Sequence, residues 1–336
     1  MAIPTQQLTP ESIFNAFNAF QQSMALKGAA ELDIFTHIGD GASTAVEIAG
    51  RTGAAERGVR ILCDFLTIHG FLMKDGDRYG LTPESALFLN KRSPAYTGTI
   101  GKFLVNEHSI NAFRDIAATV RHGGALPGVG HMDPENPIWV EFAHSMVPIV
   151  IMAAQAIAPM VTEPGRPAKV LDIAAGHGMF GVSVARHNPA AEIVAVDWKN
   201  VLEVALENAT RAGVRDRYRT LPGSAFDVEF GSGYDVVLLT NFLHHFEPAA
   251  NVKLLRKIHA AMKPGGVLAT LEFVPNDDRV TPPVAAAFSM IMLANTERGD
   301  AYTFAELGAM LREAGFADST LHDLQASPQR VILSRR

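Results

Sequence analysis

The chain has 336 residues, of which 48% are hydrophobic and 19% charged, and this length predicts two globular units at about 100 to 200 residues each. Its 29 basic and 35 acidic residues give a net charge of −6, which argues against a protein whose main partner is a nucleic-acid backbone. The single cysteine, Cys63, excludes an internal disulfide and a cysteine metal cluster. Its place in an apolar helical pattern predicts a buried thiol in a reducing compartment.

The N-terminal residues do not combine a basic region with an apolar one, so we expect no signal peptide. The most apolar stretch, residues 147–161, contains Pro148, Gln155 and Pro159 and is shorter than the roughly 20 residues that cross a membrane. It predicts a buried helix or the wall of a pocket. We therefore expect a cytoplasmic protein.

The first hundred residues predict several helices and a short hairpin. Thr9 and Pro10 can begin a helix, and its apolar residues recur at helical spacing: Ile13, Phe14, Phe17, Phe20 and Met24. Further helices are predicted over 29–38, 43–49 and 56–69. Ser43 or Thr44 can cap the helix over 43–49, with Glu47 completing a capping box. An Asp-Gly pair predicts a hairpin within 71–82, and the whole forms a winged helix-turn-helix.

A winged helix-turn-helix often docks on DNA, so the charge of this region indicates whether DNA binding or another role is favoured. Residues 1–165 hold 11 basic and 16 acidic side chains, net −5, whereas residues 166–336 hold 18 and 19, net −1. Affinity for duplex DNA depends on neutralised phosphates, and the half that would bind DNA is the more acidic one. A role in dimerisation or in closing a substrate site is favoured over DNA binding.

After a helix over 138–160 and a linker over 163–167, short β-rich runs alternate with helices, which is typical of a doubly wound parallel sheet. Strands are predicted over 169–174, 192–197, 218–221, 234–240 and 266–274. Helices are predicted over 181–187, 201–212 and 250–262. The last runs, 319–324 and 330–333, have no helix between them and predict an antiparallel pair.

The strongest motif lies at residues 170–181, where a buried strand runs into a glycine-rich turn and then a helix. Gly176, Gly178 and Gly181 fit G-x-G-x-x-G, which lets the backbone approach a ligand at a helix N-terminus. Asp197 follows Gly178 by 19 residues, at the end of the next strand, where its carboxylate can accept ribose hydroxyls. This spacing alone would also suit a nicotinamide-dependent dehydrogenase.

Three details argue against the dehydrogenase, and the first two favour a cofactor that carries positive charge. Asp172, inside the strand, would repel a pyrophosphate but suits a sulfonium and an ammonium group. The loop has no Arg or Lys to meet a phosphate. The segment Met-Lys-Pro-Gly-Gly-Val at 262–267 predicts a tight turn into an apolar strand, as methyltransferases have at this point.

With these motifs the chain resembles the class I S-adenosylmethionine-dependent methyltransferases, and among them the O-methyltransferases typified by the caffeic acid and hydroxyindole enzymes. The resemblance covers nearly the whole chain. It implies an α/β fold: a Rossmann-like, seven-stranded catalytic domain at 165–336, an α-helical winged-helix dimerisation domain at 1–100, and linking helices at 101–164 that line the substrate pocket. It also implies a homodimer, a small-molecule acceptor and S-adenosyl-L-methionine with S-adenosyl-L-homocysteine as product, but no metal, nucleic acid or membrane partner.

The family motif D-x-G-x-G-x-G appears here with Ala174 in place of its first glycine. The family's Asp-Met-Phe segment on the adenine side appears as Ser-Ala-Phe, so a hydroxyl replaces a carboxylate, and Asp227 stands next to it. The cofactor contacts that the resemblance implies are Asp172, Ala174, Gly176, Gly178, Asp197, Trp198, Ser224, Ala225, Phe226 and Asn241.

The segment 240–248 predicts the start of a helix with two adjacent histidines. His244 matches the family's general base, and His245 stands where an acid is usual. An imidazole with a pKa near 6.5 can take the proton of a hydroxyl as the methyl group moves. The alternatives are a structural pair of histidines and a metal site, but adjacent helical residues point about 100° apart and chelate one ion poorly.

Glu272 matches the acid that orients the histidine, and Asp300 is expected to replace the second orienting glutamate of the plant enzymes. The implied substrate contacts are Phe103, His108, Trp139, Phe142, His144, Met146, Phe288, Met292 and Asn295, which suit a flat, apolar acceptor. The resemblance thus predicts methylation of a small aromatic or polyketide-like hydroxyl. C- or N-methylation on the same fold and a non-catalytic, metabolite-sensing regulator are the alternatives.

Overall fold

The computed structural model describes residues 8–128, 136, 138–325 and 327–336. Contacts between residues divide the chain into two compact units, one ending at Asn106 and the other beginning at Glu107, and each is described by itself.

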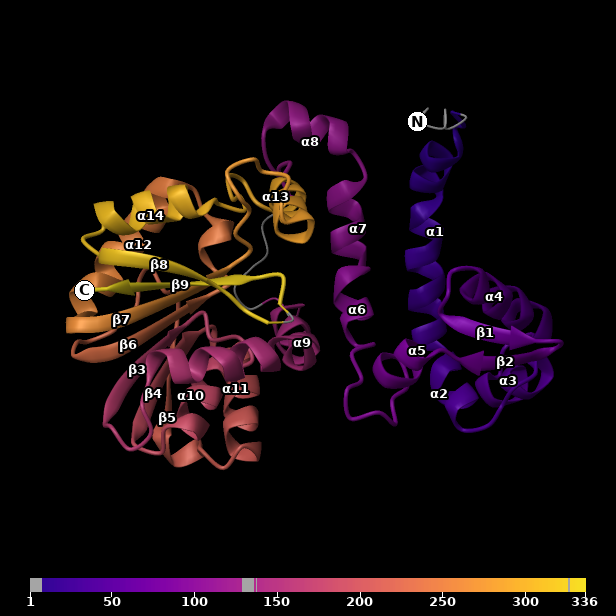
Figure 1. Ribbon diagram of the computed structural model, residues 1–336, viewed down its shortest axis with the longest axis horizontal. Coiled ribbons are helices and arrows are strands. Elements are labelled where there is room, and N and C mark those ends of the chain that lie inside the picture. The colour runs from indigo at the N-terminus through magenta and orange to yellow at the C-terminus, as the bar shows by residue number, and fades with distance from the viewer. Residues whose placement is uncertain (1–7, 129–135, 137, 326) are drawn as a thin grey trace, which may run out of the picture. The chain divides into compact units, whose positions relative to one another are not determined.

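The first unit contains the predicted helices and hairpin (Figure 1). Its elements are α1 (Glu11–Glu31), α2 (Ile34–Gly39), α3 (Ala45–Thr52), α4 (Glu56–Ile68), β1 (Leu72–Asp75), β2 (Arg78–Leu81), α5 (Pro83–Phe88) and α6 (Ile100–Leu104). Thr44 caps α3, and the predicted capping box with Glu47 is present. Cys63 lies in the core of this unit, and burial raises the pKa of its thiol to about 12. The predicted buried thiol is therefore confirmed.

The first helix differs from the prediction at both ends. Pro10 is its N-cap residue, without a side-chain hydrogen bond, so the predicted Thr9 start is wrong by one residue. At the other end, α1 continues through Gly28 to Glu31, so the helix predicted over 29–38 begins too early, and α2 starts only at Ile34. The chain breaks instead at Asp33, whose φ of 56° is left-handed. Gly28 has a normal φ and open space around it, so a helix tolerates it there.

The second unit begins with α7 (Glu107–Phe113), α8 (Ile116–His122) and α9 (Ile138–Val161). By length and composition α9 could span a membrane. One side of the helix, however, packs into the core against α10 and the sheet, through Ala153, Ala154, Ile157 and Ala158. This confirms the predicted helix over 138–160 and shows that its apolar stretch, 147–161, is buried on one side.

Within the described part of the chain, a seven-stranded sheet has the order β5-β4-β3-β6-β7-β9-β8 (Figure 1). Its strands are β3 (Ala168–Ile173), β4 (Ala191–Asp197), β5 (Tyr218–Pro222), β6 (Tyr234–Thr240), β7 (Met262–Glu272), β8 (Ala317–Asp323) and β9 (Arg330–Arg335). Strands β3 to β7 pair in parallel, and β9 pairs antiparallel with both β7 and β8. The predicted antiparallel closing pair is confirmed.

Helices cover the sheet through two hydrophobic cores. One core joins the sheet to α9, α10 (Met179–His187) and α11 (Lys199–Arg211), and the other joins it to α12 (Pro248–Ala261) and α14 (Phe304–Glu313). The remaining helix, α13 (Pro283–Asn295), lies in contact with α7 and α8. Two 3-10 turns, η1 (Arg215–Arg217) and η2 (Leu243–His245), complete the described elements.

The tight turn predicted at 262–267 is part of a longer strand. β7 already begins at Met262, and its register against β6 shifts between Tyr234 and Val236. Gly265, with a φ of 77°, lies in this irregularity. The Met-Lys-Pro-Gly-Gly pattern therefore encodes a bulge within the strand, because a left-handed glycine lets the chain bend without leaving the sheet.

The strand order reverses between β3 and β6. From β3 the chain continues to β4 and β5 on one side, and from β6 to β7 on the other. The carboxyl ends of these parallel strands meet at one edge of the sheet, which is where ligands bind in open α/β sheets. Most of the predicted cofactor and catalytic residues lie at the ends of these strands or in the loops that follow them, whereas Asp300 comes after α13.

Candidate active site

The glycine-rich loop after β3 turns through left-handed residues at Ala174, Gly176 and Gly178. The glycines serve different purposes. A Cβ on Gly178 would lie 2.6 Å from the Tyr218 hydroxyl oxygen, and one on Gly181 would lie 2.8 Å from Asp172 Oδ2, so both are needed for internal packing. A Cβ on Gly176 would meet nothing closer than 3.9 Å. Gly176 is thus the glycine of this loop with space beside it for a ligand.

Asp172 lies in β3 and is completely buried. Its Oδ2 accepts a 2.9 Å hydrogen bond from the Gly181 N–H, while Oδ1 has no partner among the described residues. Burial raises the pKa of this carboxyl to about 8. A buried acceptor without a partner is costly, and a cationic donor would satisfy it.

Asp197, at the end of β4, ties that strand to the glycine-rich loop. Its Oδ2 accepts from the Gly176 N–H at 2.7 Å, and its Oδ1 accepts from the Trp198 N–H at 2.7 Å. Burial raises the pKa of Asp197 to about 6. Each carboxylate oxygen can accept more than one hydrogen bond, so capacity remains for a diol.

His177 is a residue of the loop that the sequence did not predict to have a role. Its Nδ1 accepts the N–H of Met179 at 3.0 Å, and its backbone carbonyl accepts from Asn208 Nδ2 at 2.9 Å. Burial lowers the pKa of His177 to about 4, so the ring is neutral and remains an acceptor at neutral pH. The imidazole satisfies one of the free N–H groups at the start of α10.

The remaining predicted cofactor residues lie on loops beside this one. Trp198 precedes α11 and packs in one cluster with Trp139 of α9. In the loop after β5, the Ser224 hydroxyl accepts the N–H of Phe226 at 3.2 Å. Lys257 of α12 donates to the carbonyls of Ala225 and Phe226, at 3.1 and 2.9 Å. The lysine holds this loop in place, and nothing in the sequence pattern indicated it.

The turn after β6 carries the two histidines. The predicted helix start at 240 is wrong, because Asn241 has a left-handed φ of 56°, a 3-10 turn follows, and α12 begins only at Pro248. His244 and Glu272 are both buried, and the Nδ1 of His244 lies 2.5 Å from Oε2 of Glu272. In the neutral ring the proton then sits on Nδ1, and Nε2 is the free base.

Glu272 also holds the backbone of this turn. Its Oε1 accepts the N–H groups of Phe242 and Leu243, at 3.0 and 2.8 Å. One carboxylate therefore fixes both the backbone that carries His244 and the orientation of its ring. Such an arrangement is typical of a base whose protonated form is stabilised by an adjacent acid.

His245 lies beside His244, with their ring centroids 4.3 Å apart. Burial, together with the neighbouring His244, holds the pKa of His245 well below its usual range, so this ring is neutral. In the described residues its ring nitrogens have no hydrogen-bond partner within the protein. The same part of the chain contains no group of three or more metal-ligating side chains.

Asp300 has a different partner from the expected one. Its carboxylate pairs with Arg279 at 3.2 Å, and Arg279 also binds Glu306. The cation draws Asp300 into this partly exposed network. Of the two predicted acids, Glu272 is the one that contacts His244 in the described structure.

The predicted substrate residues are spread over several elements. Phe288 of α13 packs edge-on against His244, with centroids 4.9 Å apart, and stacks on Phe273 at 4.1 Å. His108 of α7 has a buried Nε2 without a partner. For the other predicted contacts the structure gives only burial and single contacts. His144 is exposed, Met146 packs against the core, Met292 is buried and Asn295 donates to the Ile291 carbonyl. Trp139 and Phe142 lie on α9, and Phe103 belongs to the first unit.

Three further residues fix the turn and were not predicted. Asn251 Nδ2 donates to the carbonyls of Leu243 and Phe246, at 2.9 and 3.2 Å. The Tyr302 hydroxyl donates to the Phe246 carbonyl at 2.6 Å, and Gln329 binds the side chain of Asn241. These contacts are with backbone carbonyls or across long sequence separations, so no local motif signals them.

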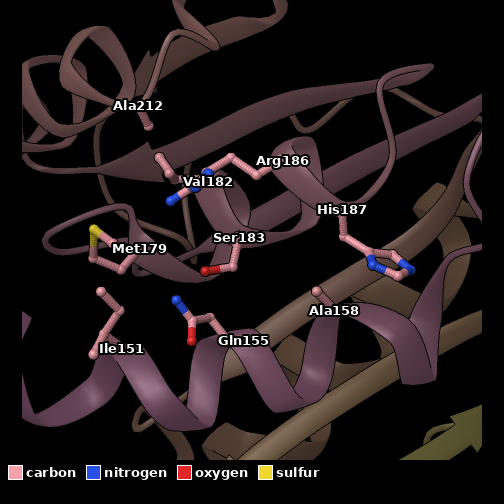
Figure 2. A pocket seen from close by; sticks show the side chains of 9 residues that line it. All are labelled: Ile151, Gln155, Ala158, Met179, Val182, Ser183, Arg186, His187 and Ala212. Carbon is pink, nitrogen blue, oxygen red and sulfur yellow. The ribbon is translucent and has the colours of Figure 1, made fainter.

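A separate pocket of about 280 Å³ lies between α9 and α10 (Figure 2). Gln155 and Ser183 face each other across it, and Arg186 and His187 lie farther along α10. None of the predicted site residues lines this pocket. It therefore lies outside the site that the strand ends define.

Comparisons with known proteins agree with this geometry. A family model described as an O-methyltransferase domain matches residues 142–317, and one described as an O-methyltransferase dimerisation domain matches residues 14–91. The chain is 28% identical over 321 residues to 3-hydroxy-5-methyl-1-naphthoate 3-O-methyltransferase from Streptomyces sahachiroi, covering 94% of this chain and 92% of that protein. It is 26% identical over 333 residues to an L-tyrosine C(3)-methyltransferase from Streptomyces lavendulae, covering 95% and 90%.

A crystal structure from Nostoc punctiforme PCC 73102, described as that of a candidate O-methyltransferase, superposes with a TM-score of 0.94. It is 48% identical and covers 98% of this chain and 100% of that one. The fold is that of an S-adenosylmethionine-dependent methyltransferase. The chain belongs to the O-methyltransferase family, with its catalytic and dimerisation domains, as the resemblance predicted.

Proposed function

We propose that the protein transfers the methyl group of S-adenosylmethionine to a hydroxyl of a small aromatic or polyketide-like molecule, with His244 as the general base. The observation that carries this proposal is the buried pair of His244 and Glu272 at the carboxyl ends of β6 and β7. The hydrogen bond from Nδ1 to Glu272 fixes the orientation of the His244 ring, and it leaves Nε2 as a proton acceptor.

The residues around the glycine-rich loop fit the cofactor. Gly176 offers open backbone, and the unpartnered Oδ1 of Asp172 suits an ammonium group. Asp197 retains lone pairs for the ribose hydroxyls. When bound, S-adenosylmethionine supplies an electrophilic methyl group on its sulfonium.

His244 would act on the acceptor oxygen. As the methyl group is transferred to that oxygen, Nε2 would take the hydroxyl proton. Glu272, at 2.5 Å from Nδ1, stabilises the imidazolium that results. The imidazolium then releases its proton to water, and the neutral histidine can act in the next catalytic cycle. Most of the rate would come from alignment of the acceptor, because attack on the methyl group is in line.

An aromatic acceptor is supported by the surroundings of the base. Phe288 packs edge-on against His244 and stacks on Phe273, so one side of the base is an aromatic wall. Aromatic surfaces of this kind bind flat, apolar ligands. The relative from Streptomyces sahachiroi acts on a hydroxynaphthoate, which has the same character.

We further propose that the protein works as a homodimer formed through its dimerisation domain. Residues 14–91 match that domain, and α1 exposes a row of large apolar side chains that includes Phe14, Phe17 and Phe20. Phe17 is 77% exposed. A row of exposed phenylalanines on one helix is costly in water and is typical of a protein interface.

C-methylation is the second candidate, favoured by the relative that methylates carbon 3 of L-tyrosine. Removal of the proton from a phenol also makes its ortho carbon nucleophilic, so one base could serve both reactions. The position of the new methyl group separates them, because an ether methyl and a ring methyl give different NMR shifts.

The test is incubation with isotopically labelled S-adenosylmethionine and a panel of hydroxynaphthoates, phenols, catechols, keto acids and amines, with products read by mass spectrometry and NMR. A labelled O-methyl ether of an aromatic hydroxyl is the expected product. A labelled ring methyl or N-methyl product without any ether would overturn O-methylation. Turnover of amines or keto acids alone would overturn the aromatic acceptor.

A further inference from the structure

Two glycines of the second unit lie against neighbouring backbone so closely that no other residue fits. A Cβ on Gly299 would lie 2.2 Å from the carbonyl oxygen of His244 and 3.0 Å from the carbonyl carbon of His245. A Cβ on Gly124 would lie 2.1 Å from the carbonyl oxygen of Glu297. Neither glycine has a left-handed φ, so the contact itself, and not the conformation, requires glycine.

One short segment, Thr296–Gly299, which follows α13, makes both contacts: Gly299 is its last residue, and Gly124 lies against its Thr296 and Glu297 carbonyls. On one side the segment lies against Gly124, at the end of α8, and the Ala125 N–H donates to the Thr296 carbonyl at 2.8 Å. On the other side Gly299 lies against the turn that carries His244 and His245. The segment therefore fills the space between α8 and η2.

The segment is also held internally. The Thr296 hydroxyl donates to the Met292 carbonyl at 2.7 Å and accepts the Gly299 N–H at 2.9 Å. Thr296 is buried, so this hydroxyl has no competing water. One side chain thus fixes the distance from the end of α13 to Gly299.

We propose that Gly124, Thr296 and Gly299 are positioning residues for methyl transfer. Together they form a spacer that fixes the position of the turn carrying His244 relative to α8 and α13. The spacer joins the turn that carries His244 to α13, which carries Phe288, and to α8. It keeps the base and the aromatic wall of the acceptor site at a constant separation. The inference rests on the proposed role of His244 as base.

Substitution of Gly299 tests the spacer through steric displacement. Gly299→Ala must change the spacing between the segment and the turn that carries His244, because its Cβ would lie 2.2 Å from the His244 carbonyl oxygen and 2.6 Å from the Thr296 hydroxyl oxygen. A misplacement of about 1 Å can cost on the order of 100-fold in rate. We expect kcat to fall by about 10-fold or more, while the Kd for S-adenosylhomocysteine by calorimetry changes by less than about threefold. Gly308→Ala is the matched control, because a Cβ there meets only the end of the flexible Arg312 side chain.

A second pair of variants tests the spacer without a clash. Thr296→Val keeps the shape but removes both hydroxyl hydrogen bonds, whereas Thr296→Ser keeps them. We expect the valine variant to lower kcat by about fivefold or more with little change in the acceptor KM, and the serine variant to restore it to within about twofold. This pair decides the question if Gly299→Ala does not fold.

Full kcat in both Gly299→Ala and Thr296→Val would overturn the spacer, as would equal losses of kcat and cofactor affinity, which indicate general damage. His244→Ala separates this result from failure of the proposed function. If His244→Ala is inactive while the spacer variants are fully active, the spacer alone is wrong. If His244→Ala keeps full activity, the assigned base is wrong.

Discussion

Glu272 and His244 are 28 positions apart in the sequence, yet a buried 2.5 Å contact joins the Oε2 of one to the Nδ1 of the other. The same carboxylate accepts two backbone N–H groups of the turn on which the histidine lies. The strand β7 therefore positions a histidine that follows β6. The proposed chemistry depends on this relationship between two neighbouring parallel strands.

Glu272→Gln should impair the chemical step far more than cofactor binding. The amide keeps the size of the side chain but loses the charge that stabilises an imidazolium, and its NH₂ group cannot accept the bonds that a carboxylate oxygen accepts. We expect kcat to fall by about 100-fold or more, by analogy with orienting acids in other enzymes. Calorimetry with S-adenosylhomocysteine is the control, and equal losses in kcat and affinity would indicate a structural role instead.

His245→Asp should change the pH dependence of turnover. At present the ring beside His244 is neutral, because burial and the neighbouring imidazole hold the pKa of His245 well below its usual range. A carboxylate 4 to 6 Å from His244 would favour the protonated form of the base, so the acidic limb of the kcat profile should move to higher pH by about one unit. His245→Asn carries no charge and should leave the limb in place. An unchanged limb in the aspartate variant would contradict this account.

Asp172→Asn should stabilise the cofactor-free protein and weaken cofactor binding. Burial raises the pKa of Asp172 to about 8, above its ordinary value near 4, so the folded state holds a proton that the unfolded state releases. Its contribution to stability is therefore present at low pH and is lost as pH rises from about 4 to 8. The asparagine variant lacks this loss, so its Tm advantage over the native protein should grow across that range.

Calorimetry completes the test of Asp172. The asparagine can still accept the Gly181 N–H through its carbonyl oxygen, but it offers no negative charge to an ammonium group. We expect the Kd for S-adenosylmethionine to rise by about 10-fold. A variant with unchanged affinity and an unchanged pH dependence of Tm would show that this carboxyl neither faces the cofactor nor holds a proton.

Phe17→Glu should disrupt the proposed dimer without unfolding the first unit. The Phe17 side chain is 77% exposed on α1, so the single chain loses no core packing. Sedimentation should change from a species of twice 36.2 kDa to one of 36.2 kDa. Val46→Glu on α3, also an exposed apolar position in the same unit, is the control that should keep the native mass. A native protein that sediments as a monomer would contradict the dimer.

The sheet could be predicted from the sequence because its strands are short β-branched runs bounded by turn residues, and β6 was predicted with the bounds that the structure has. The N-terminal helix was less predictable, since a glycine such as Gly28 signals a break only where the backbone needs it. Gly265 is the opposite case. Its left-handed conformation bends a strand, although a Pro-Gly-Gly sequence usually indicates a turn.

Candidate site residues could be predicted where they lie at or just after the end of a strand and match a motif, as Glu272, Asp197 and His244 do. It was not predictable where a contact depends on tertiary placement. Asp300 pairs with Arg279, and no spacing in the sequence indicates that competition. Tyr302 fixes the turn that carries His244 through a single backbone carbonyl 56 positions away, a contact that leaves no local pattern.

The most direct test of the central claim is a parallel measurement of kcat and of S-adenosylhomocysteine affinity in His244→Ala. The account predicts that kcat falls by about 100-fold or more, because the acceptor proton has no base, while the Kd stays within about threefold of the native value. A variant that turns over within about threefold of the native rate would show that His244 is not the base.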